Sequence, residues 1–95
     1  MQRRTEFFEI KSPCGHYGLC GTFKNEEEAL AEINRSYKQA KERGYDNRHE
    51  KWVIVCNRVI TERRDNGDFL SEKIDRFVVA CTEYRESEEA FVFVY

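Results

Sequence analysis

The sequence contains no apolar run that approaches the roughly 20 residues of a membrane-spanning helix. Its first residues, Met1-Gln2-Arg3-Arg4, lead directly into Thr5-Glu6 without the apolar core of a secretory signal peptide. Internal repeats, low-complexity tracts and flexible linkers are also missing. These absences argue against a membrane-spanning or secreted protein. We expect one cytoplasmic domain over residues 1–95.

An excess of charge of one sign is missing as well. Eighteen acidic and sixteen basic residues give a formal net charge of −2 and are mixed along the whole chain. The protein therefore has no global field that would attract a polyanion such as nucleic acid.

What the sequence does contain is a long two-stranded arm from Lys51 to Tyr84. Asn66-Gly67 favours a type I′ turn within Asp65-Asn66-Gly67-Asp68, because both central residues tolerate a positive φ. Centring the hairpin there predicts a register with these pairs: Arg58 with Asp75, Thr61 with Glu72, Val59 with Ile74, Val55 with Val78, Val53 with Ala80, and Trp52 with Cys81. A bulge near residues 71–73 would shift the outer part by one. We expect the outer arm, about residues 57–76, to protrude from the core.

The rest of the chain predicts three more strands and one helix. Alternating residues indicate strands over 5–12, 17–23 and 89–95. Asn25 and Glu28 form an N-terminal capping signal, and Gly44 follows a helix that ends near Arg43. The apolar stripe of that helix is narrow and consists of Ala29, Leu30, Ile33, Tyr37 and Ala40. The predicted fold is a two-layer α+β domain in the order ββαβββ, with a single helix packed on a mostly antiparallel sheet of about five strands.

Both faces of the inner arm are apolar. We expect the helix to cover the face with Val53, Val55, Val59, Ile74, Val78 and Ala80, joined by Phe91, Phe93 and Tyr95 if a two-residue turn lies at Glu86-Ser87. The other face carries Trp52, Ile54, Cys56, Phe77, Val79 and Cys81, with Val92 and Val94. One helix cannot cover both faces, and exposed apolar patches usually mark a partner surface.

The uncovered face predicts a homodimer or a partner-protein interface centred on Trp52 and Phe77, which are aromatic residues typical of interface anchors. Ile54, Val79 and Val92 would belong to the same surface. Two alternatives stay open. The first hairpin would cover that face if it folded over as a sandwich layer, and a longer turn near Glu86 would exchange the faces of the last strand.

The outer arm carries five basic and five acidic residues, which indicates a solvated ladder of ion pairs. Arg63 and Arg64 at the tip, with Arg3 and Arg4, keep contact with nucleic acid as an alternative. Such a binder needs basic residues that no acid opposes.

The four cysteines are expected to be reduced thiols. Cys56 and Cys81 fall four positions apart in the predicted register, roughly 13 Å along a strand, whereas Cα atoms joined by a disulfide stay within about 7 Å. Registers that match Phe8 or Ile10 with Phe23 place Cys14 and Cys20 on opposite faces.

The segment from Cys14 through His16 to Cys20 is the one local pattern with possible chemistry. It supplies three zinc ligands, but the spacing fits no standard zinc motif, and a fourth ligand would have to come from His49 or a distant thiol. As a nucleophile, Cys14 beside His16 lacks a third group to orient the base. We therefore expect no metal, no cofactor and no catalytic residues.

The sequence thus predicts a small, non-enzymatic protein-binding module that acts as an inhibitor or accessory protein through its apolar sheet face and charged arm. Its size and dense mixed charge suit a phage or mobile-element accessory protein, which we keep as a hypothesis. A nucleic-acid binder and a zinc or thiol protein are the alternatives.

Overall fold

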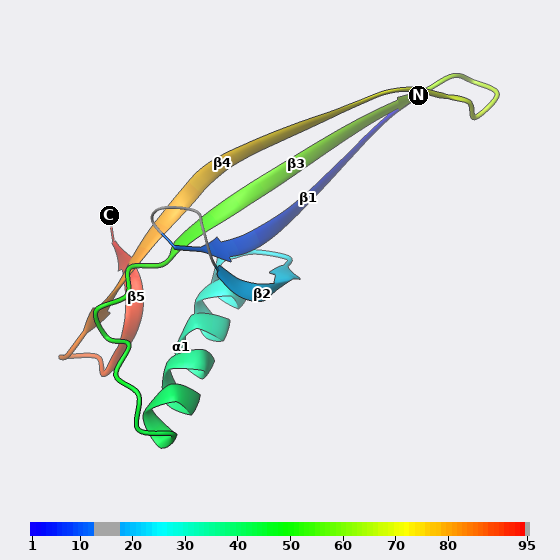
Figure 1. Cartoon of the computed structure of the whole chain (residues 1–95). Coiled ribbons are helices and arrows are strands. Elements are labelled where there is room, and N and C mark those ends of the chain that lie inside the picture. The colour runs from blue at the N-terminus through cyan, green and yellow to red at the C-terminus, as the bar shows by residue number, and fades with distance from the viewer. Residues whose placement is uncertain (13–17, 95) are drawn as a thin grey trace.

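The computed structural model describes residues 1–12 and 18–94, and Cys20 only through its backbone. In chain order, the elements are β1 (Gln2–Lys11), β2 (Gly18–Phe23), α1 (Glu26–Glu42), β3 (Val53–Arg63), β4 (Phe69–Arg85) and β5 (Ala90–Val94). The strands form one antiparallel sheet in the spatial order β2-β1-β3-β4-β5, and α1 lies against one face of it (Figure 1). The predicted α+β fold with the element order ββαβββ is confirmed.

The helix begins and ends where the capping residues predict. The side chain of Asn25 accepts a hydrogen bond from the Glu28 backbone N–H at 2.8 Å, which satisfies one of the free donors of the first turn. After the C-cap residue Arg43, Gly44 adopts a φ of 84°, a left-handed conformation that glycine enters without strain. Ala29, Ile33 and Tyr37 are the buried residues of the helix, so the predicted apolar stripe does face the sheet.

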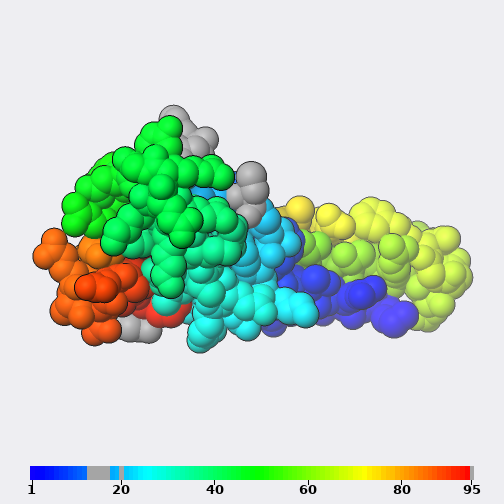
Figure 2. Space-filling model, turned by 90° about the horizontal axis from the view of Figure 1, so that it is seen from below, coloured from blue at the N-terminus to red at the C-terminus, as the bar shows by residue number. Residues whose placement is uncertain are grey.

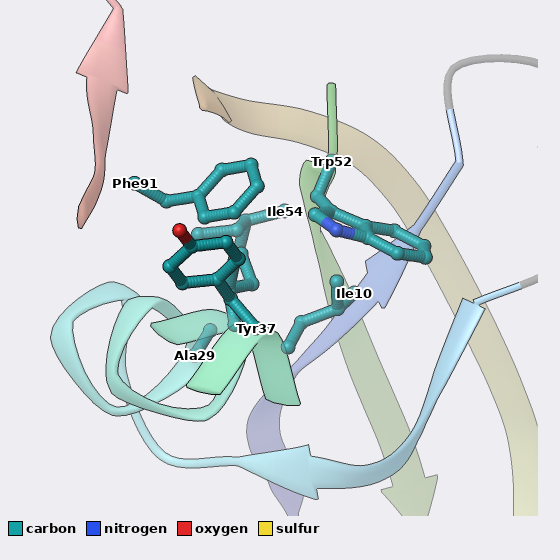
Figure 3. Close-up of a cluster of buried hydrophobic side chains, with 7 residues drawn as sticks. Ile10, Ala29, Tyr37, Trp52, Ile54 and Phe91 are labelled. Atoms are coloured by element: carbon teal, nitrogen blue, oxygen red, sulfur yellow. The ribbon is translucent and has the colours of Figure 1, made fainter. Parts of the chain in front are cut away.

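The core lies between α1 and the base of the sheet. Ile10 of β1, Ile54 of β3 and Phe91 of β5 are 0 to 1% exposed and cluster with Ile33 and Tyr37 of the helix (Figure 3). Trp52, just before β3, belongs to the same buried cluster. The helix therefore packs on the base of the sheet at one end of the molecule, where it contacts β1, β2 and β5.

The predicted register of the arm is confirmed along its outer length. Val55 pairs with Val78, Arg58 with Asp75, Val59 with Ile74, and Thr61 with Glu72. Opposite charges and β-branched residues thus face each other across the two strands, as cross-strand pairing favours.

The turn has a different form from the one predicted. Gly67 has a φ of 90°, and Glu89 is the only non-glycine residue of the described chain with a positive φ, so Asn66 does not adopt the type I′ conformation. The Gly67 N–H donates to the Arg64 carbonyl oxygen at 2.8 Å, and the Arg64 N–H donates to that of Asp68 at 2.8 Å. Because of this three-residue loop with a left-handed glycine, Arg63 pairs with Phe69, one residue away from the predicted register. A register shift between Glu62 and Arg63 then restores the predicted pairing along the rest of the outer arm.

A bulge in β4 changes the inner register. Ile54 pairs with Ala80 and Val55 with Val78, so Val79 is an extra residue opposite β3. Val53 consequently pairs with Cys81, and the Thr82 N–H donates to the Trp52 carbonyl oxygen at 2.9 Å. The predicted pairs of Val53 with Ala80 and of Trp52 with Cys81 are therefore wrong.

The bulge also overturns the predicted assignment of the two faces. Because β4 gains one residue, Ala80 shares a face with Ile54 instead of Val53. The helix was expected to cover Val53 and Val55, but it covers the face that holds Trp52 and Ile54. Phe91 and Phe93 do lie on the helix side, as expected.

The chain turns between β4 and β5 through four residues. Arg85 pairs with Ala90, so the predicted two-residue turn at Glu86-Ser87 is wrong, and Glu89 has a φ of 51°. The turn is two residues longer than predicted. Because side chains alternate with a period of two, this leaves the alternation of β5 relative to β4 unchanged. A longer turn therefore does not exchange the faces of β5.

The first strand extends the arm instead of covering the sheet. β1 pairs with β3 from Lys11 opposite Val53 to Gln2 opposite Glu62, and β2 continues the same sheet beyond β1. The sandwich alternative for the first hairpin is thus wrong. The arm, predicted as two strands, has three and extends from the helical body to give overall dimensions of 56 × 27 × 21 Å (Figure 2).

The exchange of faces predicts unequal effects of two neighbouring core substitutions. Ile54→Ala empties a fully buried site and is expected to lower the free energy of unfolding by about 2 to 5 kcal/mol. Val53→Ala, on the opposite and partly exposed face, is expected to lower it by less than about 1.5 kcal/mol. Urea unfolding of both variants measures the difference, and a larger loss for Val53→Ala would contradict the face assignment.

Candidate functional site

The sheet face opposite α1, here called the open face, is an apolar surface that no described helix or strand covers. The register places these apolar side chains on it: Phe7, Val53, Val55, Val59, Ile74, Val78, Cys81, Val92 and Val94. Ile74, Val78 and Val94 are 56, 55 and 40% exposed. Such exposure of branched aliphatic residues along one sheet face is typical of a binding surface.

A polar network crosses the middle of the open face. The Asn57 side-chain amide donates to Oε1 of Glu9 at 2.7 Å, and Nη2 of Arg76 lies 3.4 Å from the same oxygen. These three residues come from β3, β1 and β4, so the network ties the three strands of the arm together. Lys11 adds an ion pair to Glu9 at 3.5 Å. The network divides the apolar surface into a part near the base and a part along the arm.

The part near the base contains a shallow hollow of about 280 Å³. It is lined by Lys51, Val53, Cys81, Thr82, Glu83 and Val94. Cys81 is exposed there as a free thiol. The hollow offers an apolar floor with one charge of each sign at its rim, which suits a protein side chain from a partner.

The residues predicted for a partner surface lie in three different places. Trp52 and Ile54 are 7 and 0% exposed in the core under α1, so their assignment to an uncovered face is wrong, and Val79 also packs against that core. Phe77 is 39% exposed on the helix side of the arm, where the Arg58 guanidinium lies 5.1 Å from its ring centroid. Val92 is on the open face.

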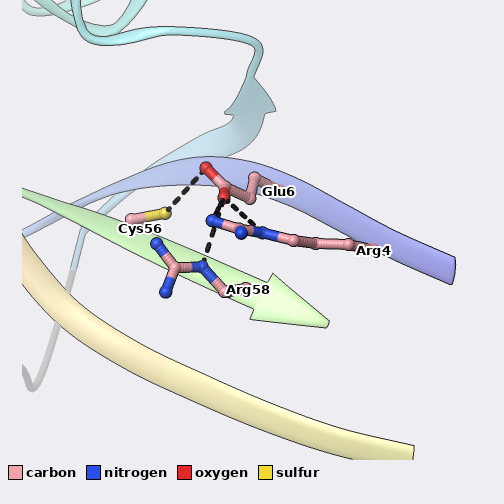
Figure 4. Close-up of polar contacts among 4 residues, drawn as sticks. All are labelled: Arg4, Glu6, Cys56 and Arg58. Carbon is pink, nitrogen blue, oxygen red and sulfur yellow. Dashed lines mark hydrogen bonds and ion pairs between the residues drawn. The ribbon is translucent and has the colours of Figure 1, made fainter. Parts of the chain in front are cut away.

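The helix side of the arm carries a charged cluster around Glu6. Its carboxylate accepts hydrogen bonds from Arg4 at 2.6 and 3.0 Å and from Arg58 at 3.2 Å, and Sγ of Cys56 lies at 3.9 Å (Figure 4). The hydrogen bond from Arg4, supported by Arg58, lowers the pKa of Glu6. Burial, together with the charge of Glu6, raises the pKa of the Cys56 thiol. Cys56 therefore lacks the lowered pKa of a reactive thiol.

At the tip, basic and acidic residues are mixed. Nη1 of Arg63 donates to the Gly67 carbonyl oxygen at 3.1 Å, and Arg64 follows in the turn. Below the turn, a hollow of about 370 Å³ is lined by Met1, Arg3, Thr5, Thr61 and Arg63. Arg3 and Arg63 thus meet from two strands that the sequence did not reveal as neighbours.

The cysteine and metal predictions are tested only in part. Cys56 and Cys81 are free, as their separation predicted. Cys14, His16 and the side chain of Cys20 lie outside the described residues. Within residues 1–12 and 18–94, no group of three or more His, Cys, Asp or Glu side chains is placed to hold a metal ion. The same part of the chain contains no helix that is long and apolar enough to cross a membrane.

Comparison with protein families, with curated protein sequences and with solved structures finds no match to this chain.

Sequence reasoning missed Phe7, Glu9 and Asn57 as parts of one surface. Each is unremarkable alone, and they meet only because β1 lies beside β3. The signal was the alternation within β1, where Phe8 and Ile10 face the helix and Phe7 and Glu9 face the other way.

The Glu6 cluster predicts a pH dependence of stability. Because Arg4 and Arg58 lower the pKa of Glu6, its stabilising contribution is present above the unfolded pKa of about 4.3 and is lost as the pH falls through the folded pKa. Glu6→Gln should therefore lose less stability than the wild type between neutral and acidic pH. Urea unfolding at neutral and at acidic pH measures the loss of stability, with Glu86→Gln in the β4–β5 turn as the control. Equal acid sensitivity of wild type and Glu6→Gln would contradict the role of the cluster.

Proposed function

We propose that the protein is a small, non-enzymatic protein-binding module whose open face receives a partner protein. The observation that carries the proposal is the apolar side chains on a sheet face that no described element covers, with Ile74 and Val78 more than half exposed. Burying such groups is the main favourable contribution to protein association.

The chemistry of the open face defines the partner. It accepts an apolar surface that reaches the aliphatic side chains on both sides of the Glu9–Asn57–Arg76 network. Arg76 is only partly satisfied by Glu9 at 3.4 Å, so an acidic or carbonyl group of the partner is the complement to its guanidinium. The occupant is therefore a folded protein with an apolar ridge and a nearby acceptor.

Two further features support binding over catalysis. The burial of Cys56 and the raised pKa of its thiol disfavour nucleophilic chemistry there. The polar groups of the open face are engaged with one another across three strands, which suits a rigid docking surface. The proposed mode of action is occupation of the partner's surface, as an inhibitor or an accessory protein does.

The proposal predicts that a charge on the open face abolishes partner capture. Val59→Glu places a carboxylate on the central strand of the open face, and a buried unpaired charge opposes association. Affinity capture from the native host cells should lose its bound protein with this variant. Gln39→Glu, on the exposed side of α1, adds the same charge away from the face and should capture normally. Equal capture by both variants, with thermal unfolding showing both folded, would sink the open-face proposal.

Nucleic-acid binding is a second candidate because Arg3 and Arg63 line one hollow at the tip. This alternative predicts salt-sensitive binding to single- or double-stranded DNA or RNA that weakens when Arg63 and Arg64 are changed to Gln. The protein-binding proposal predicts no salt-sensitive retention, because Glu62, Asp65 and Asp68 oppose these arginines in the same turn. Fluorescence anisotropy of labelled oligonucleotides at low and high salt separates the two.

A further inference from the structure

The outer part of β4 is an unpaired sheet edge. β5 pairs only with residues 81–85 of β4, and no described strand lies beside residues 69–80 on the side away from β3. An edge strand of this length presents a row of backbone donors and acceptors to another strand. On the other side of the arm, β3 has β1 as its neighbour, and β2 pairs with β1 only from Phe8 to Lys11.

The direction in which the backbone N–H and C=O groups of β4 point follows from the hydrogen bonds on the β1 side of β3. Met1 and Arg63 exchange hydrogen bonds, with N–H···O distances of 2.8 and 2.6 Å, so the backbone of Arg63 points to β1. Because the direction alternates, the backbones of Arg58 and Ile60 point to β4 and bond their partners Asp75 and Lys73. The N–H and C=O groups of the even-numbered residues 72, 74, 76 and 78 therefore point outward.

Apolar side chains are exposed along the same segment. Five of the eight large hydrophobic residues that are exposed in the described chain lie on this part of β4: Phe69, Leu70, Ile74, Phe77 and Val78. Their exposed fractions run from 39 to 58%. The edge thus combines free backbone groups with apolar side chains, the two contributions that strand addition uses.

The charges on this edge are self-complementary in one register. The segment reads Glu72-Lys73-Ile74-Asp75-Arg76. When two copies run antiparallel with Ile74 opposite the partner's Ile74, Lys73 meets the partner's Asp75 and Glu72 meets the partner's Arg76. By symmetry, every charge in the segment then faces its opposite.

Other two-fold registers that use the outward groups are less favourable. Centring the pair on Glu72 or on Arg76 opposes each of these charges to its own copy. Ile74 also lies near the middle of the free edge. In its register Val78 is opposite the partner's Leu70, and the pairing ends before Cys81, where β5 pairs with β4.

We propose that two copies of this chain associate through antiparallel pairing of their β4 edges, centred on Ile74. The two five-stranded sheets become one continuous sheet, and both helices lie on the same side of it. Within one copy, Lys73 lies 3.9 Å from Asp75 and Arg76 lies 3.4 Å from Glu9. In the dimer, Lys73, Asp75 and Arg76 also face opposite charges of the partner. The inference concerns the edge of β4 and stands independently of the binding role of the open face.

Two charge reversals test both the association and its register. Glu72→Lys alone opposes the new lysine to the partner's Arg76, and Arg76→Glu alone opposes the new glutamate to the partner's Glu72. Each variant should dimerise at least about tenfold more weakly than the wild type, since like charges then meet at two symmetric sites. An equimolar mixture of the two variants should recover the dimer, because each reversed charge then meets its opposite.

Sedimentation equilibrium from micromolar to hundreds of micromolar protein measures the three cases, and thermal unfolding confirms that each variant is folded. Gln39→Glu, on the exposed side of α1, serves as the control that leaves this dimer intact. The proposal is overturned if the wild type stays monomeric over the whole range. It is also overturned if the single reversals leave dimerisation unchanged, or if the mixture fails to recover it.

Discussion

β4 runs beside β3 with two register shifts, and at the inner one Val79 is an extra residue opposite β3. This bulge places Ala80, Tyr84 and Phe91 on the side of Ile54 instead of the side of Val53. A core of three aromatic residues (Tyr37, Trp52 and Phe91) and several aliphatic ones can then form between the sheet and a single narrow helix. The smaller aliphatic residues of β3 and the outer part of β4 remain on the opposite face. The arrangement of the core and the existence of the open face therefore have the same origin.

Much of this fold could be predicted from local signals. Asn25, Glu28 and Gly44 define the ends of the helix, and the paired charges of Arg58 and Asp75 define the register of the outer arm. These signals act over a few residues or across one strand pair, so the sequence carries them directly. The loop form at Gly67 was not predicted, because Asn66-Gly67 is compatible with more than one tight turn.

The bulge and the neighbourhood of β1 could not be predicted in the same way. A bulge at Val79 leaves no mark in a sequence where Val78, Val79 and Ala80 are all apolar, and both alternations fit. Its position depends on how β4 packs on the rest of the molecule. For the same reason, the predicted partner residues Trp52 and Ile54 were assigned to the wrong face. Within the described residues, Ile74, Val78 and Val94 are apolar and exposed on the face opposite α1.

The two surfaces of the arm differ in chemistry and in what they can bind. The open face is broad, apolar and crossed by one polar network, which suits the side chains of a folded partner. The β4 edge offers backbone groups and a symmetric charge sequence, which suits a second copy of the same strand. Ile74 and Val78 have side chains on the open face and free backbone groups on the β4 edge. Pairing at the edge would therefore join two open faces into one larger surface.

The assignment of the sheet faces is tested most directly by nuclear Overhauser effects between methyl groups of the isolated protein. The methyl groups of Ile33 on α1 should show contacts to its core neighbours Ile10 and Ile54 and none to Val55. Contacts between Ile33 and Val55, with none to Ile54, would place the helix on the other face and contradict the account.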